Sequence, residues 1–350
     1  MRQRRILTTA TVLGATAFLS ASALGVGSGT DARAQSIPLA EQRYVLGDEI
    51  ATYNGFIMSG GPPPDGIPSI DSPQFVNASA ARLAPGDLVI GYYHRGEARA
   101  YPQKILVHHE IVNDQVGGLN MAITYCPLTA TAQGFERGTT TLGVSGQLLN
   151  SNLVMYDRES GSLFSQIAAT GLRGDHHGRS LVEVNLIWTT WERWRSKYPE
   201  TRVLSERTGH LRNYTRDPYG SYNPLGGYYS QQGTIFPLLH TSRNQQDKEM
   251  VVGARTAERS AYFVMADLAR ERILRTENFL AVYDSELDTG HIYLIAGETP
   301  DLRALSDGAY EIGGERYRPD ELPLEEAVSI EAFFFAWNAF YPQSESPGRG

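Results

Sequence analysis

The chain has 350 residues, of which 20% are charged, and its formal net charge is −8. This length can bury one large core or two ordinary ones, and the acidic balance argues against nucleic acid and anionic membranes as partners. Cys126 is the single cysteine, which excludes an intramolecular disulfide and leaves a free thiol, a metal ligand or a buried apolar residue.

The N-terminal segment predicts a cleavable export signal. Arg4 and Arg5 precede an uncharged stretch over residues 6–27, and the small residues Ala32 and Ala34 offer a cleavage site. We therefore expect residues 1–34 to be a signal peptide and the mature protein to be periplasmic or extracellular, through the general or the twin-arginine route. Cleavage removes four Arg and one Asp, which leaves 27 basic and 38 acidic residues and a net charge of −11. No later apolar run reaches membrane-spanning length, so no transmembrane segment is expected.

The next segments predict an irregular arm followed by strands. Residues 35–85 are rich in Pro, Gly and Ser, which indicates an N-terminal arm without regular elements. From Asp87 onwards, short apolar runs alternate with Gly, Asn and Asp, as is typical of antiparallel sheets. These runs cover residues 88–93, 105–112, 119–125, 140–144 and 153–156.

Two helices are expected among the strands. A capping box at residues 189–192 would open a helix that runs to about Tyr198, and an apolar segment over 331–340 would form a C-terminal helix. Pro199 and Pro342 would end them.

A faint internal repeat suggests two lobes. Residues 89–91 followed by 97–101 recur as 251–253 followed by 258–262 with one residue fewer in the turn, and 156–157 recurs as 283–284. We expect a mainly β fold (β-rich α+β) with antiparallel sheets in two associated lobes, whose duplication stays open, and a few short helices. The first lobe, 86–205, would carry the site, the second, 206–342, would include the C-terminal helix, and 343–350 would be a disordered tail.

The segment with most chemical information is a predicted hairpin. Gly117-Gly118 lies between two alternating apolar runs and favours a two-residue type I′ turn, whose central residues both need positive φ. If Val116 pairs with Leu119, the same register places His109 opposite Cys126 and turns Glu110 to the other face. A one-residue bulge would break this pairing.

Three interpretations of the His109 and Cys126 pair remain open. Cys126 would be a nucleophile with His109 as its base and Glu110 as a supporting carboxylate. Alternatively, Cys126 and His109 would be ligands of Cu or Zn, completed by residues distant in sequence. In the third interpretation, Cys126 is a buried residue at a strand end beside a hydrogen-bonded histidine.

Several ordered motifs resemble a known family. Residues 109–114, 124–128, 143–146 and 150–158 are similar to the family called domain of unknown function 3179. The similarity continues through 191–205, 217–220 and 249–253 and ends near 334–342, so that it covers almost the whole mature chain. The resemblance implies kinship and export, and it implies no particular reaction.

Three positions depart from the pattern of that family. Members usually read Trp-His-Glu, Cys-Pro-Leu-Cys and a Trp before Ser-Gln, whereas this chain has His108, Thr129 and Phe164 there. Loss of the second cysteine excludes a two-cysteine redox or four-cysteine metal scheme. Because His109, Glu110 and Cys126 are retained, we expect a site that depends on these three residues.

A second wall of the site is expected in the following segment, where small and amide residues precede a strand. Ser145, Asn150, Asn152 and Asp157 are candidate ligand-binding residues, since exposed N–H groups in such loops can bind anions or small polar ligands. The tyrosines at 219, 222, 228 and 229 would form either a sugar-stacking surface or a packed loop. The sequence thus leaves three functions open: an exported enzyme, a non-catalytic module that binds a metal or small ligand, or a structural envelope protein.

Overall fold

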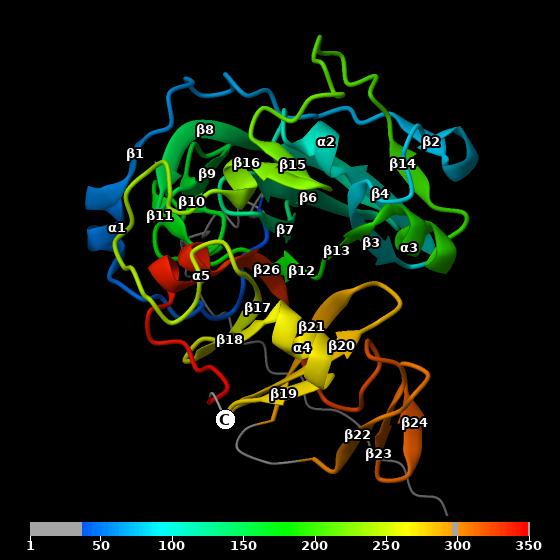
Figure 1. Ribbon diagram of the computed structural model, residues 1–350. Coiled ribbons are helices and arrows are strands. Elements are labelled where there is room, and N and C mark those ends of the chain that lie inside the picture. The colour runs from blue at the N-terminus through cyan, green and yellow to red at the C-terminus, as the bar shows by residue number, and fades with distance from the viewer. Residues whose placement is uncertain (1–36, 296–299, 349–350) are drawn as a thin grey trace, which may run out of the picture. The chain divides into compact units, whose positions relative to one another are not determined.

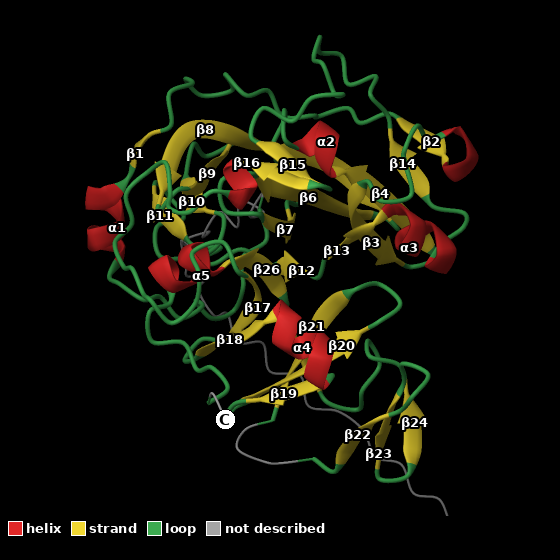
Figure 2. Ribbon diagram, viewed as in Figure 1, coloured by secondary structure: helices red, strands yellow, loops and turns green. Residues whose placement is uncertain are grey.

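The computed structural model describes residues 37–295 and 300–348. Gln35–Gly350 form one compact unit, and the predicted signal peptide, 1–34, lies outside the described residues. The unit is β-rich with short helices (Figures 1 and 2), as the sequence predicts. Within the described part of the chain, no helix is long and apolar enough to cross a membrane.

Two sheets are formed by residues between 75 and 204. Their strand orders are β12-β7-β6-β5 and β13-β3-β4-β14-β2, and the pairing is antiparallel except between β14 and β4. The strands are β2 (Phe75–Asn77), β3 (Leu88–His94), β4 (Glu97–Pro102), β5 (Ile111–Val116), β6 (Leu119–Cys126), β7 (Thr131–Glu136), β12 (Glu183–Val184), β13 (Ile187–Thr190) and β14 (Arg202–Leu204).

An inserted sheet and a small ribbon extend this part of the chain. The inserted sheet has the order β1-β8-β9-β10-β11, and the ribbon pairs β15 with β16. Their bounds are β1 (Met58–Ser59), β8 (Leu142–Leu149), β9 (Asn152–Asp157), β10 (Leu163–Ser165), β11 (Gly171–Arg173), β15 (Gly220–Tyr222) and β16 (Leu225–Gly227).

Residues 250–333 form the remaining sheets, in the orders β18-β17-β26, β19-β20-β21-β25 and β22-β23-β24. These strands are β17 (Met250–Arg255), β18 (Ser260–Val264), β19 (Ile273–Arg275), β20 (Phe279–Asp284), β21 (Thr289–Leu294), β22 (Leu302–Ala304), β23 (Tyr310–Ile312), β24 (Glu315–Tyr317), β25 (Glu325–Ala327) and β26 (Ile330–Phe333). The helices are α1 (Ile50–Phe56), α2 (Gln103–Leu106), α3 (Trp191–Lys197), α4 (Met265–Glu271) and α5 (Phe334–Phe340), with 3-10 turns at Ala78–Ala80 and Tyr228–Ser230.

Two sets of strands share one topology. The first set is β13-β3-β4 with β12-β7-β6-β5, and the second is β26-β17-β18 with β25-β21-β20-β19. A left-handed residue precedes β5 and β19 at Glu110 (φ 58°) and Arg272 (φ 68°). Another precedes β7 and β21 at Ala130 (φ 51°) and Asp288 (φ 58°). Non-glycine residues seldom adopt such φ values, so their recurrence at matching positions favours a duplicated unit, which we propose for this chain.

The helix that follows each set packs on its sheet through a glycine. A Cβ atom on Gly91 of β3 would overlap the ring of Trp194 in α3, and one on Gly253 of β17 would overlap the ring of Trp337 in α5. Both tryptophans are fully buried. The absence of a side chain at each glycine therefore makes room for an indole.

The structural correspondence differs in detail from the sequence repeat. Ala100 pairs with Gly91, and Tyr262 pairs with Gly253, so Tyr262 corresponds to Ala100 and not to Tyr101. The 156–157 motif ends β9 in the inserted sheet, whereas 283–284 ends β20, which corresponds to β6. The identical residues that suggested the sequence repeat at these places therefore do not occupy equivalent positions in the two sets.

Most predicted elements are confirmed, with several corrections. Strands occur as predicted near 88–93, 119–125, 140–144 and 153–156, and α3 ends at Lys197 before Pro199. The run 105–112 begins as helix and turn because α2 occupies its start, and 331–333 is strand β26 followed by α5. The capping box is wrong, since the N-cap residue Thr190 makes no side-chain cap. The predicted irregular arm contains α1, β1 and β2.

The boundaries of the second lobe and of the tail also differ. Residues between 206 and 248 pack on the first set, where Tyr228 donates a hydrogen bond to the carbonyl of Leu128 at 2.8 Å. In the predicted disordered tail, Glu345 bridges Ala261, and the Ser344 hydroxyl accepts a hydrogen bond from the Trp337 indole.

Replacing either packing glycine tests the matched helix contacts. Gly91→Ala and Gly253→Ala are each expected to lower the free energy of unfolding by about 1–3 kcal/mol, because the added methyl group overpacks a buried indole. Gly55→Ala is the control, since a Cβ there meets open space, and it should be neutral or stabilise α1 slightly. Urea denaturation measures all three, and unchanged stability in the first two variants would contradict the described packing.

Candidate functional site

The predicted hairpin exists, but its paired region stops short of His109. β5 and β6 pair from Ile111 with Thr124 to Val116 with Leu119, as the register predicts, and Gly117 and Gly118 have φ values of 57° and 83°. Cys126 instead pairs with Thr131 of β7.

The helical turn after α2 explains the difference. The N–H of Glu110 still bonds to the carbonyl of Leu106 at 2.7 Å, so His109 belongs to this turn. Glu110 then takes a left-handed conformation and starts the strand at Ile111. The prediction that His109 lies opposite Cys126 is therefore wrong.

His109 connects three segments of the chain. Its Nδ1 lies 2.7 Å from the carbonyl oxygen of Pro68, and its Nε2 lies 2.7 Å from the hydroxyl of Tyr214. A carbonyl oxygen only accepts, so Nδ1 carries the proton and Nε2 accepts from Tyr214. Burial lowers the pKa of His109 to about 4, which keeps the ring neutral. Both nitrogens are thus engaged away from Cys126, and His109 acts as a positioning residue.

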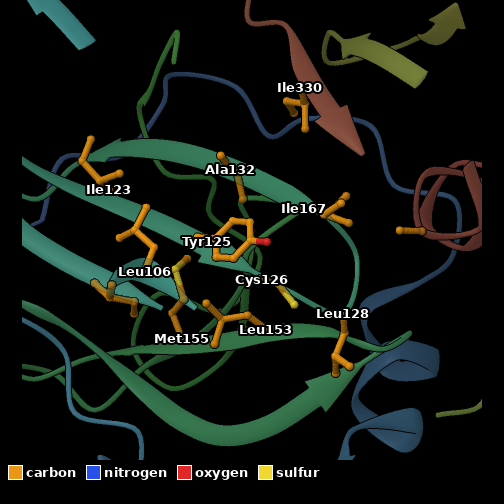
Figure 3. Close-up of a cluster of buried hydrophobic side chains, with 14 of the residues drawn as sticks. Leu106, Ile123, Tyr125, Cys126, Leu128, Ala132, Leu153, Met155, Ile167 and Ile330 are labelled. Carbon is orange, nitrogen blue, oxygen red and sulfur yellow. The ribbon is translucent and has the colours of Figure 1, made fainter. Parts of the chain in front are cut away.

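Glu110 and Cys126 are two buried acidic groups, near enough for the charge of Glu110 to act on the thiol. Glu110 is 8% exposed, and burial raises the pKa of its carboxyl to about 8. Burial, followed by the charge of Glu110, raises the pKa of the Cys126 thiol to about 12. The Sγ atom donates a weak hydrogen bond to the carbonyl of Ser151 at 3.7 Å. Figure 3 shows Cys126 among apolar side chains that include Leu128 and Leu153. Both groups therefore keep their protons at neutral pH.

The described residues do not provide a complete set of metal ligands. Across residues 37–295 and 300–348, no group of three or more His, Cys, Asp and Glu side chains is arranged to hold a metal ion. The structure also does not bring His109 and Cys126 together as two ligands, because His109 faces Pro68 and Tyr214.

The four residues predicted as a second wall make hydrogen bonds within the protein. All four are buried. Ser145 donates to the carbonyl of Val154, and Asn150 donates to Ala339 O at 3.0 Å and accepts from Leu239 N at 2.8 Å. Asn152 donates to Thr129, Thr131 and Gln166. Asp157 accepts from Thr140 and Ser160. Their polar groups hold the inserted sheet and its turns, and the geometry does not present them to a ligand.

A polar groove lies beside the hairpin, at a place that the sequence analysis does not predict. Its volume is about 670 Å³, which lies in the range of small-ligand sites. Its lining includes the tyrosines Tyr214 and Tyr222 and the amide residues Gln103 and Asn223. The lining residues are 84, 86–88, 103–104, 214–217 and 220–223.

A hydrogen-bond relay connects the groove to the hairpin. The Gln103 amide donates to the Tyr125 hydroxyl at 3.2 Å and to Asp217 Oδ2 at 2.9 Å. The Tyr229 hydroxyl also donates to Asp217 Oδ2, at 2.9 Å, and the hydroxyls of Tyr125 and Tyr222 lie 3.1 Å apart. Burial raises the pKa of Tyr125 above its ordinary value. The relay fixes these polar atoms below the groove, and within the described residues Asp217 forms no ion pair.

The tyrosine segment is a packed loop and contributes little aromatic surface. The rings of Tyr222 and Tyr229 are stacked with their centroids 4.0 Å apart, and Tyr228 and Tyr229 are buried. Asp217 belongs to the 217–220 motif of the sequence resemblance, which is the one signal that could have indicated this place. Nothing local to Gln103 indicates its contact with a residue 114 positions away.

Together these features define a β-rich protein with a polar groove that a hydrogen-bond relay joins to the β5–β6 hairpin. The model of the family described as protein of unknown function (DUF3179) matches residues 64–344, so the chain belongs to that family. No curated protein and no solved structure matches the chain.

Replacement of Glu110 tests the buried carboxyl. Burial raises its pKa in the folded state from the ordinary value of a glutamate to about 8, so the folded protein binds more protons than the unfolded chain between these two values. The free energy of unfolding should therefore fall as pH rises through this window. Glu110→Gln keeps the shape and removes the titration, so it should be more stable than the wild type, by a few kcal/mol, above pH about 8.

Thermal unfolding from pH 5 to 9 measures the effect. Glu258→Gln, a change at an exposed turn residue, is the control and should follow the wild type. A wild-type profile that runs parallel to that of Glu110→Gln would contradict the burial of an ionisable carboxyl.

Proposed function

We propose that this chain is an exported protein that binds a small polar ligand in the groove beside the β5–β6 hairpin. The observation that carries the proposal is the relay of Gln103, Asp217 and Tyr125, which holds polar groups in fixed positions under an open groove. Fixed donors and acceptors of this kind orient a ligand and lower the ordering cost of binding. Export is supported by the pattern of residues 1–34 alone.

The lining favours a ligand without strong net charge. Asp87 and Asp217 offset Lys104 and Arg216, and Lys104 Nζ already lies 3.5 Å from Asp87. The other polar groups are hydroxyls and amides, which donate and accept hydrogen bonds equally well. A neutral molecule rich in hydroxyl and amide groups satisfies this lining best.

Saturation-transfer NMR on Gln35–Gly350 with N-acetylglucosamine as probe tests the groove. We expect transfer to the probe and a loss of affinity of about three- to tenfold in Asn223→Ala, which removes one amide from the lining. Asn223 is exposed, so the change should not affect folding. Asn77→Ala, an exposed change outside the lining, is the matched control. Equal saturation transfer to the probe from Asn223→Ala and from the wild type would contradict binding in the groove. So would the absence of transfer to all three probes, N-acetylglucosamine, glucose and glycylglycine.

A second candidate is chemistry at the Glu110 and Cys126 pair. Within the described residues, the carboxyl of Glu110 has no hydrogen bond or ion pair, and burial is the single cause of its shifted pKa. In the enzyme form, Glu110 replaces His109 as the base that takes the proton from Sγ. In the metal form, the thiolate and carboxylate are two ligands of Cu or Zn, and both lose their protons on binding.

Metal analysis and alkylation separate these two forms. Stoichiometric metal that is lost in both Cys126→Ser and Glu110→Gln is the expected result for the ligand form. For the enzyme form, we expect iodoacetamide to label native Cys126 faster as pH rises through about 8, with this dependence absent in Glu110→Gln. A metal-free protein whose thiol resists labelling until it is denatured would refute both forms and leave Cys126 as a core residue.

A further inference from the structure

The segment between β14 and β15 carries three arginines against two acidic residues, Glu206 and Asp217, on an otherwise acidic chain. Residues 207–216, here called the basic loop, contain Arg207, Arg212 and Arg216 together with His210, and they contain no Asp or Glu. All four of these residues are exposed. None of the three arginines forms an ion pair within the described residues. The loop therefore presents positive charge that the fold itself does not neutralise.

The tip of the basic loop is apolar. Leu211 is 98% exposed, so it gains nothing from the core. It lies between His210 and Arg212 in the sequence, and the segment that leaves β14 extends away from the sheets (Figure 1). An apolar side chain beside an arginine on a projecting loop suits a partner that is anionic at its surface and apolar beneath.

The base of the basic loop is held in place. Tyr214 is 6% exposed, and its hydroxyl bonds to His109 Nε2 at 2.7 Å and to Thr208 Oγ1 at 2.6 Å. These bonds fix the two ends of the tip. A partner therefore meets a loop that needs little further ordering.

We propose that the basic loop docks on an anionic lipid bilayer, with Leu211 entering the boundary between headgroups and acyl chains. Arg207 and Arg212 would then contact lipid phosphates, a geometry that gains from both charge and apolar burial. The acidic balance of the whole chain opposes this docking weakly, since charges more than about 8 Å from the surface are screened at physiological salt. A nucleic acid would use the arginines and leave Leu211 exposed.

Vesicle flotation of Gln35–Gly350 tests the proposal. This portion is compact by itself and lacks the apolar stretch at 6–27, which would bind lipid directly. Phosphatidylcholine vesicles with about one quarter phosphatidylglycerol should bind the protein in a salt-sensitive manner, and pure phosphatidylcholine should not. Leu211→Ser should weaken binding about tenfold. The Arg207→Gln, Arg212→Gln double variant should weaken it by about tenfold or more.

A second exposed leucine, Leu225, provides the control for Leu211→Ser. Leu225→Ser changes a different exposed leucine, which is 61% exposed, and it should bind like the wild type. Equal binding to neutral vesicles, or wild-type binding by Leu211→Ser, would overturn the proposal. So would a dimer in sedimentation velocity that Leu211→Ser abolishes, because the tip would then contact a second copy. None of these variants lies in the lining of the groove, so the result is independent of the groove proposal.

Discussion

The arm and the basic loop are held beside the first set by the imidazole of His109, which accepts one hydrogen bond and donates another. Its donor atom holds the arm at Pro68, and its acceptor atom holds the basic loop at Tyr214. The polar groove uses Tyr214 as part of its wall. A neutral ring is required for both bonds, and burial supplies it by lowering the pKa of His109. The groove and the basic loop therefore share one anchor.

A single left-handed residue, Glu110, determines where the paired strands of the hairpin begin. Glu110 ends the turn after α2 and starts β5, and its backbone carbonyl accepts from Tyr125 N at 2.7 Å. Arg272 does the same for Tyr283 N at 3.0 Å in the second set. The backbone geometry thus recurs in both sets, whereas the buried carboxyl of Glu110 in the first set is replaced by the guanidinium of Arg272 in the second. This contrast places the chemical difference between the sets in side chains and not in topology.

The sequence predicts what depends on local patterns and misses what depends on long-range contacts. Gly117-Gly118 specifies the turn and the register from Ile111 to Val116, because both glycines need positive φ. The extension of that register to His109 fails because the helical turn after α2 competes with the strand, and apolar periodicity over 105–112 fits both structures. The groove is missed because Gln103 and Asp217, which form its relay, meet only in the folded chain.

Nitrogen-detected NMR titration of His109, assigned by comparison with His109→Gln, tests the central claim that this ring positions the arm and the basic loop. The account predicts a neutral ring protonated at Nδ1, a pKa of about 4, and no change of either in Cys126→Ser. A ring protonated at Nε2, or a pKa near the ordinary histidine value that shifts when Cys126 is replaced, would contradict the account. Such a result would indicate that His109 interacts with the Cys126 thiol.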